Sequence, residues 1–276
     1  MEKLIITIAP TGSIPTKKNN PNVPIRPDEI IQTGILCEKA GASIIHVHAR
    51  NPVDETASTD FHLFEEIHQG LKQETNLIIQ ISTGGRAGME YEQRCERLSL
   101  KPEMASLTTG SVNFPSSVYV NSPDLICALA KDMKTHGIKP EIEVFDTSMI
   151  QNALNLSGQG LIDQPLHFDF VMGLKGAIPA TIENLVHLKN SIPHGSTWTV
   201  AGIGAFQLPM GIHAIAMGGH VRVGLEDCIY FSKGKLASNE QLVNRIVQLS
   251  NIMGREIATP DEAREILGLK FFKNKR

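Results

Sequence analysis

Two histidines separated by one residue give the clearest chemical signal in this sequence. His46 and His48 stand in the apolar segment 44–50, IIHVHAR. Side chains two residues apart on a strand point to the same side, so both imidazoles face one way. Burying both rings at a strand end is costly unless something satisfies them. The pair therefore predicts a metal site, with histidines packed and hydrogen-bonded at a strand end as the alternative.

A third ligand is expected on another strand, because catalytic zinc usually has three protein ligands and one open position. The segment 220–227, HVRVGLED, provides candidates. If the strand extends far enough, Glu226 lies on the same side as Arg222 and completes a His, His, Glu site. Asp227 has the opposite parity, but a loop beginning there could bring it beside Arg222, which would keep it ionised and oriented. An ordinary loop salt bridge is the alternative.

Polar residues also end three other predicted strands. Ser82 precedes Gly84 and Gly85, which would let the backbone approach a ligand or a phosphate group, although a plain flexible turn is an equal alternative. Glu143 shares parity with a neighbouring glutamate and is a candidate to face the same pocket, or instead a helix or solvent. The remaining hydroxyl candidates are Ser106, Thr108 and Thr109.

The elements that must position these residues alternate regularly between strand and helix patterns. Strands are predicted at 4–9, 43–48, 77–82, 104–108, 141–145, 166–172, 197–201 and 220–223. Helices are predicted at 26–41, 60–72, 90–98, 122–136, 147–158, 181–190, 208–217, 239–254 and 260–267. This order predicts one α/β domain over residues 1–276, a (β/α)8 TIM barrel with a C-terminal helical extension, whose active site lies at the carboxyl ends of the strands.

Composition favours small-molecule chemistry. The 276 residues are 41% hydrophobic and 20% charged, and the net charge of -3 gives no basic footprint for nucleic acid. No segment approaches the roughly 18 apolar residues of a membrane span. The four cysteines are widely spaced, which argues against disulfides and fits a reducing cytoplasm. We therefore expect a cytoplasmic enzyme without membrane or nucleic-acid partners.

Several motifs together resemble the beta-keto acid cleavage enzymes nearly end to end. They are Thr11-Gly12, the 20–27 stretch, IIHVHAR, QISTGG, LKPEMASL, PEIEVFD, WTVAGIG and GGHVRVGLEDCIY. The resemblance implies a zinc-containing TIM barrel, usually a homotetramer. It also implies conversion of a β-keto acid and acetyl-CoA into acetoacetate and the CoA ester of the shortened acid.

Carried onto matching positions, the resemblance implies roles for several candidates. His46, His48 and Glu226 would be the zinc ligands, and Asp227 the general base. Arg222 and Ser82 would hold the base and the substrate, and Glu143 would match an acidic pocket position. From their places at strand ends, Ser106, Thr108, Gly84 and Gly85 are further candidates for substrate binding. Ser106 stands where related sequences can have a threonine.

One departure concerns the substrate. In members that take an amino substrate, a glutamate follows the Thr-Gly pair, whereas here Ser13-Ile14-Pro15 follows it. An apolar Ile14 would leave an ammonium group unpaired, which predicts a neutral or apolar β-keto acid. A basic substrate could still pair with Glu143.

Two other functions compete with this hypothesis. A metal-dependent barrel hydrolase would also use His-x-His, but usually on the first strand with further histidines on strands five and six. Here the pair is on the second predicted strand. Of the histidines that a hydrolase would have on strands five and six, only His167 is present, at the start of strand six. A barrel that binds a small acid or a CoA ester without catalysis is the second, and the presence of Asp227 and Arg222 argues against it.

Overall fold

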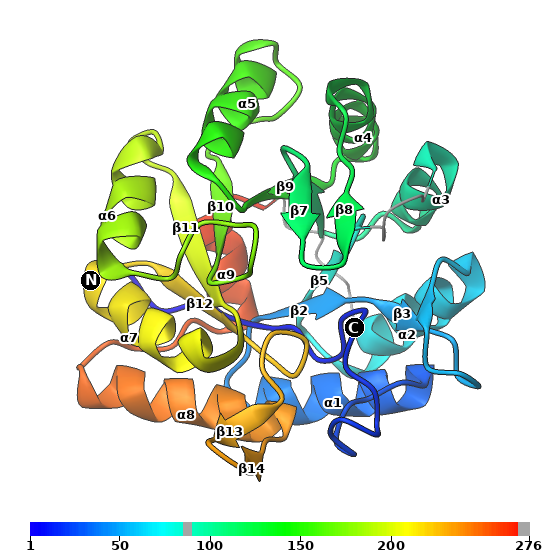
Figure 1. Ribbon diagram of the computed structural model, residues 1–276, viewed down its shortest axis with the longest axis vertical. Helices are drawn as coiled ribbons and strands as arrows, with labels where there is room; N and C mark the ends of the chain where they lie inside the picture. The colour runs from blue at the N-terminus through cyan, green and yellow to red at the C-terminus, as the bar shows by residue number, and fades with distance from the viewer. Residues whose placement is uncertain (85–89, 270–276) are drawn as a thin grey trace.

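The computed structural model describes residues 1–84 and 90–269 (Figure 1). Eight parallel strands form a closed barrel in the order β1, β12, β11, β10, β9, β6, β5, β2. The predicted TIM barrel is thus confirmed. The strands are β1 (Ile6–Ile8), β2 (Ile44–Val47), β5 (Ile78–Ile81), β6 (Met104–Thr108), β9 (Lys139–Val144), β10 (His167–Met172), β11 (Thr197–Gly202) and β12 (His220–Val223).

Helices surround this barrel, and local signals set their ends. Pro27 opens α1, and Gly41 ends it in the left-handed region at φ 113°. The third unit differs from the single helix expected at 90–98, because α3 (Tyr91–Cys95) passes into a 3-10 helix, Glu96–Leu100. The other outer helices are α1 (Pro27–Ala40), α2 (Phe61–Glu74), α4 (Pro123–His136), α5 (Thr147–Gly158), α6 (Ile182–Ser191), α7 (Gln207–Met217) and α8 (Asn239–Ile252). In the part of the chain that the structure describes, none of the helices is long and apolar enough to cross a membrane.

Three short hairpins, absent from the expected elements, occupy loops at the carboxyl ends of strands. They follow β2, β6 and β12, so they lie on the side of the barrel where the candidate residues are. Strands of two or three residues carry too little alternation to be recognised in a sequence. The hairpins are β3–β4 (Ala49–Arg50, Ala57–Ser58), β7–β8 (Val112–Phe114, Ser117–Tyr119) and β13–β14 (Tyr230–Ser232, Lys235–Leu236).

The last helix, α9 (Pro260–Leu267), covers the opposite end of the barrel (Figure 1). Its Ala263 and Leu267 pack with the first residues of three strands, Ile44, Ile78 and Met104. All five are fully buried. This apolar layer closes the amino end, which leaves the carboxyl end as the way into the barrel.

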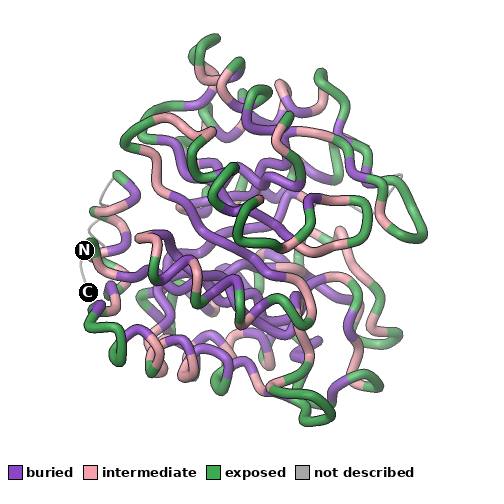
Figure 2. Tube along the Cα trace, turned by 60° about the vertical axis from the view of Figure 1, so that its left-hand side comes forward, coloured by how far each residue is buried: buried purple, intermediate pink, exposed green. Residues whose placement is uncertain are grey.

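Above that layer the barrel interior is polar, whereas TIM barrels are usually filled by branched apolar side chains. Figure 2 shows the buried strands through the centre of the molecule, with exposed loops around them. The strand registers align polar residues around the barrel, for example His46 with Gln80 and Glu143 with Asp169. Polar groups in such a place need partners. The buried set comprises Thr7, His46, Gln80, Ser106, Glu141, His167, Asp169, Thr199, His220 and Arg222.

Candidate metal centre and active site

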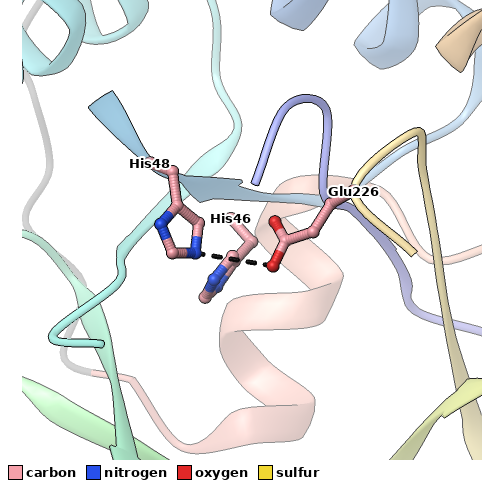
Figure 3. A group of neighbouring side chains, drawn as sticks. All are labelled: His46, His48 and Glu226. Carbon is pink, nitrogen blue, oxygen red and sulfur yellow. Dashed lines mark ion pairs between the residues drawn. The ribbon is translucent and has the colours of Figure 1, made fainter. Parts of the chain in front are cut away.

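Three side chains converge at the carboxyl end of the barrel (Figure 3). One ligand atom each from His46, His48 and Glu226 lies within 4.8 Å of the others, the one such group among the described residues. The Nε2 atom of His48 is 3.4 Å from Oε1 of Glu226. The two histidines come from the end of β2, and the glutamate follows β12. The predicted ligand set is therefore brought together by strands that both pair with β1.

Glu226 reaches this position by a turn, and the strand continuation that we expected is wrong. Strand β12 ends at Val223, and the backbone N–H groups of Asp227 and Cys228 donate to the carbonyl oxygen of Gly224. Gly224 has φ 148°, and a Cβ there would lie 1.9 Å from the carbonyl oxygen of Ala9. Only glycine permits this close approach of two backbones. The turn brings Glu226 and Asp227 to the site despite their opposite parity.

A second glycine lies against the Glu226 side chain. Gly12 follows β1 with φ 60°, and a Cβ there would lie 2.4 Å from Cγ of Glu226. The loop after β1 thus leaves no room for any side chain between its backbone and this ligand. Gly12 of the Thr-Gly pair therefore has a steric role, because its missing side chain leaves space for Glu226 beside the histidines.

The electrostatic surroundings of His46 and Glu226 favour the forms that bind a cation. Burial, followed by the charge of Arg222, lowers the pKa of His46 to about 4, so its ring is neutral near pH 7. Burial alone would raise the pKa of Glu226, but Arg222 and both histidines outweigh it and lower that pKa. A neutral imidazole at His46 and an ionised carboxylate at Glu226 are the forms in which these two residues bind metal ions.

Arg222 clamps Asp227 with two parallel hydrogen bonds. Its Nε donates to Oδ2 of Asp227 and its Nη2 to Oδ1, each at 3.0 Å, and Nη2 also donates to Oε1 of Glu226 at 2.8 Å. Burial raises the pKa of Asp227 to about 6 although Arg222 acts in the opposite direction. A fixed carboxylate with a pKa near neutrality suits a general base.

Arg222 also faces two further buried carboxylates. Its Nη1 lies 3.6 Å from Oδ2 of Asp169 and 3.9 Å from Oε1 of Glu143. The Thr108 hydroxyl donates a hydrogen bond to Glu143. Burial raises the pKa of both acids. One arginine thus faces four carboxyl groups, counting Asp227 and Glu226.

Ser82 and Gly84 lie together after β5, with Gly84 close to His48. The N–H of Gly84 donates to Oγ of Ser82 at 3.1 Å, and a Cβ on Gly84 would lie 4.0 Å from Cε1 of His48. Ser106 is buried, and its Oγ accepts from the N–H of Thr83 at 3.3 Å. Gly85 lies outside the described residues.

Two other candidates lie apart from the cluster. The Thr109 hydroxyl donates to the carbonyl oxygen of Met149, which is a structural contact. Ile14 is 70% exposed, so it does not form a buried wall in the single chain. Ile14 would therefore affect substrate choice only because position 14 provides no carboxylate to pair with an ammonium group.

Our sequence reasoning missed two buried residues of the barrel interior, Asp169 and Gln80. Asp169 faces Arg222, and the side-chain oxygen of Gln80 lies 2.6 Å from Nδ1 of His46. A signal existed in the alternation of each strand, because Gln80 stands two residues before Ser82 and Asp169 two residues after His167. Polar residues on the inward-facing side of a strand are therefore candidates for the site in the same way as polar residues at the strand ends.

The ligand pattern of a barrel hydrolase is not met. His167, the candidate on strand six, has both ring nitrogens engaged, by the Thr197 hydroxyl at 2.8 Å and by Oε2 of Glu141 at 3.2 Å. His220 accepts a hydrogen bond from the N–H of Ile5 at its Nδ1. These histidines hold the barrel together on its inner side.

Comparisons with known proteins agree with this geometry. Residues 3–269 match the model of the family described as beta-keto acid cleavage enzyme. A 3-keto-5-aminohexanoate cleavage enzyme of Fusobacterium nucleatum is 48% identical over 98% of this chain and 99% of its own. A 3-oxoadipate:acetyl-CoA acetyltransferase of Cupriavidus necator is 46% identical, over 96% of this chain and 94% of its own.

A solved structure supports the fold alone. A binary complex of ObcA with oxaloacetate superimposes with a TM-score of 0.79 at 22% identity, covering 91% of this chain and 68% of that one. The sequence matches extend over the barrel and both halves of the candidate site. The chain therefore belongs to the beta-keto acid cleavage enzyme family.

Proposed function

We propose that this chain transfers acyl groups between a β-keto acid and acetyl-CoA, releasing acetoacetate and the CoA ester of the shortened acid, with zinc at His46, His48 and Glu226. The single observation that carries the proposal is a three-ligand group directly beside the Arg222–Asp227 pair, at the open end of the barrel. Acetyl-CoA dependence is supported by the names of the relatives.

The donor set and the buried carboxyl groups nearby both suit a divalent ion. Two histidines and one carboxylate are a common catalytic zinc set, with a fourth position left for substrate. Oε2 of Glu226 is buried and has no hydrogen-bond partner among the described residues, which fits a ligand atom. A divalent cation would also favour the ionised form of the buried carboxyl groups around Arg222. Bound there, zinc would act as a Lewis acid on the ketone and carboxylate oxygens of the substrate.

Asp227 is the proposed base. It takes a proton from C2 of the keto acid, which is acidic because it lies between the ketone and the carboxylate. The carbanion attacks the thioester carbonyl of acetyl-CoA, so that a C–C bond forms and CoA leaves as a thiolate. The thiolate then attacks C3, the original ketone carbon, and the C2–C3 bond breaks to give the new CoA ester. Asp227 returns the proton to C2, which completes acetoacetate.

The other predicted residues serve binding and orientation in this proposal. Arg222 fixes both oxygens of Asp227, so the base stays aimed through both proton transfers. Ser82 and Ser106 offer hydroxyl groups to the substrate, and Gly84 lets it approach the backbone beside His48. Thr108 holds Glu143 at the acidic side of the pocket. We also propose a homotetramer, as the family resemblance implies, and a cytoplasmic location, as the widely spaced cysteines indicate.

We propose a neutral or apolar β-keto acid as the substrate. Relatives of similar identity, 48% and 46%, are named for an amino-bearing acid and for 3-oxoadipate, so overall identity does not decide the substrate. The loop 11–16, TGSIPT, offers no carboxylate to an ammonium group. Glu143, the other acid considered for that role, is already engaged by Thr108 and lies near Arg222.

A pair of substrates that differ by one amino group tests this choice. With acetyl-CoA present, we expect kcat/KM for 3-ketohexanoate to exceed that for 3-keto-5-aminohexanoate by about tenfold or more, because an unpaired ammonium costs at least about 1.4 kcal/mol. Acetoacetate release is the measurement. The variant Ile14→Glu should shift the ratio toward the amino substrate. Much faster turnover of 3-keto-5-aminohexanoate by the unchanged protein would contradict the proposal.

Two glycine variants test how Glu226 is positioned. Gly12→Ala introduces a Cβ into the space of the Glu226 side chain, so we expect a clear loss of zinc affinity. Gly137→Ala is the matched control, because Gly137 has a similar φ of 71° but no atom within 4 Å of the added Cβ. Both variants should lose about 1–2 kcal/mol of stability from backbone strain. Competition with a chelator measures affinity, and equal affinities in the two variants would refute the steric role of Gly12.

A further inference from the structure

Gln80 lies next to the candidate metal centre without belonging to its ligands. It stands on β5, directly beside His46 of β2 in the strand register. Both residues are buried, with Gln80 0% and His46 1% exposed. Oε1 of Gln80 and Nδ1 of His46 are 2.6 Å apart. Water therefore does not compete for this contact.

The chemistry of the contact decides which nitrogen of His46 is free. An amide oxygen only accepts hydrogen bonds, so Nδ1 of His46 must be the protonated nitrogen. In a neutral ring the other nitrogen, Nε2, then carries the lone pair. That lone pair is what a metal ion binds. The opposite amide orientation would place N–H groups against Nδ1 and move the ring proton to Nε2, which would block the ligand atom.

We infer that Gln80 is a positioning residue that fixes the tautomer and the ring orientation of His46 for metal binding. The inference rests on the proposed metal site. Gln80 touches neither substrate nor metal in this scheme and acts only through His46. Partners of this kind typically change metal affinity by about 10–100-fold when they are removed.

Three variants separate this role from a general effect of burial. Gln80→Met keeps the length of the side chain but replaces the amide oxygen by a thioether sulfur, which is only a weak acceptor, so we expect zinc affinity to fall by about 10–100-fold. Gln80→Glu keeps an acceptor and should retain or raise the affinity. Thr7→Val is the matched control, because Thr7 is another fully buried polar residue of the barrel interior and its hydroxyl has no hydrogen-bond partner among the described residues. It should bind zinc like the unchanged protein.

Two measurements decide the result. Chelator competition gives the zinc affinities, and nitrogen NMR of the labelled imidazole gives the tautomer of His46 in the metal-free protein. The inference requires the Nδ1–H tautomer in the unchanged protein and a shift toward Nε2–H in Gln80→Met. Affinity of Gln80→Met equal to that of Thr7→Val would overturn it.

The NMR measurement also covers the less simple outcomes. If Gln80→Met does not fold, an Nε2–H tautomer of His46 in the unchanged protein overturns the inference, and the Nδ1–H tautomer with intact zinc affinity in Gln80→Glu supports it. If the unchanged protein binds no zinc, the proposed metal function fails, while the tautomer still reports on Gln80. The two failures are therefore distinguishable.

Discussion

Asp227→Asn is expected to lower kcat by a factor of about 10²–10⁴, the usual contribution of a positioned general base. The amide has the size of the carboxylate but cannot take a proton from C2 of the substrate. Zinc affinity should stay close to that of the unchanged protein, because Asp227 is not one of the three proposed ligands. Acetoacetate release measures kcat, and metal analysis of the purified variant measures zinc content.

A charge control makes this result specific to the site. Asp163→Asn removes the same charge from an exposed position, where the side chain is 78% accessible and pairs with Lys134. An exposed pair of this kind contributes little to stability, so turnover should be unchanged. If Asp227→Asn also retains full turnover, the base lies elsewhere, and the proposed reaction loses its proton acceptor.

Removal of the metal should have a comparably large effect. After chelation we expect turnover to fall by about 10³-fold or more, since Lewis-acid polarisation is worth several kcal/mol and each 1.4 kcal/mol is a factor of ten. Added zinc should restore the turnover of the unchanged protein after chelation. His46→Ala should remain inactive at the same zinc concentration, because it has lost one of three ligands. Turnover is measured before chelation, after it and after zinc addition.

The histidine control is His62→Ala, in which an imidazole is removed from the first turn of α2. That side chain is 86% exposed, and the variant should respond to chelation and to zinc like the unchanged protein. Full turnover in the chelated protein, or in His46→Ala without added zinc, would show that the reaction does not need a metal at this site.

The sequence was sufficient for the architecture because the architecture follows local rules. Each barrel strand is a short buried segment that contains apolar residues. Helix ends are marked by residues such as Pro27 and Gly41, whose backbone preferences act within a few residues. The pairing of His46 with His48 on one side of β2 follows from the two-residue period of a strand. These features needed no knowledge of distant contacts.

The path of Glu226 to the site could be decided only by the tertiary structure. Parity along β12 suggested an extended strand, but the chain turns at Gly224, where the backbone of Ala9 lies too close for any side chain. Gly12 then gives room for the Glu226 side chain. Both contacts join residues more than 200 positions apart, so no local pattern reveals them.

The partners of the functional groups were likewise decided by the fold. The amide of Gln80 meets His46 because β2 and β5 are neighbours in register, and Asp169 meets Arg222 across the barrel interior. Closure of the barrel brings buried charges from different strands within a few ångströms, and their pKa values depend on these distances and on burial. The sequence by itself determined which elements form and which chemistry the residues offer. The tertiary structure decided which of those residues meet, because burial and contact between distant segments exist only after folding.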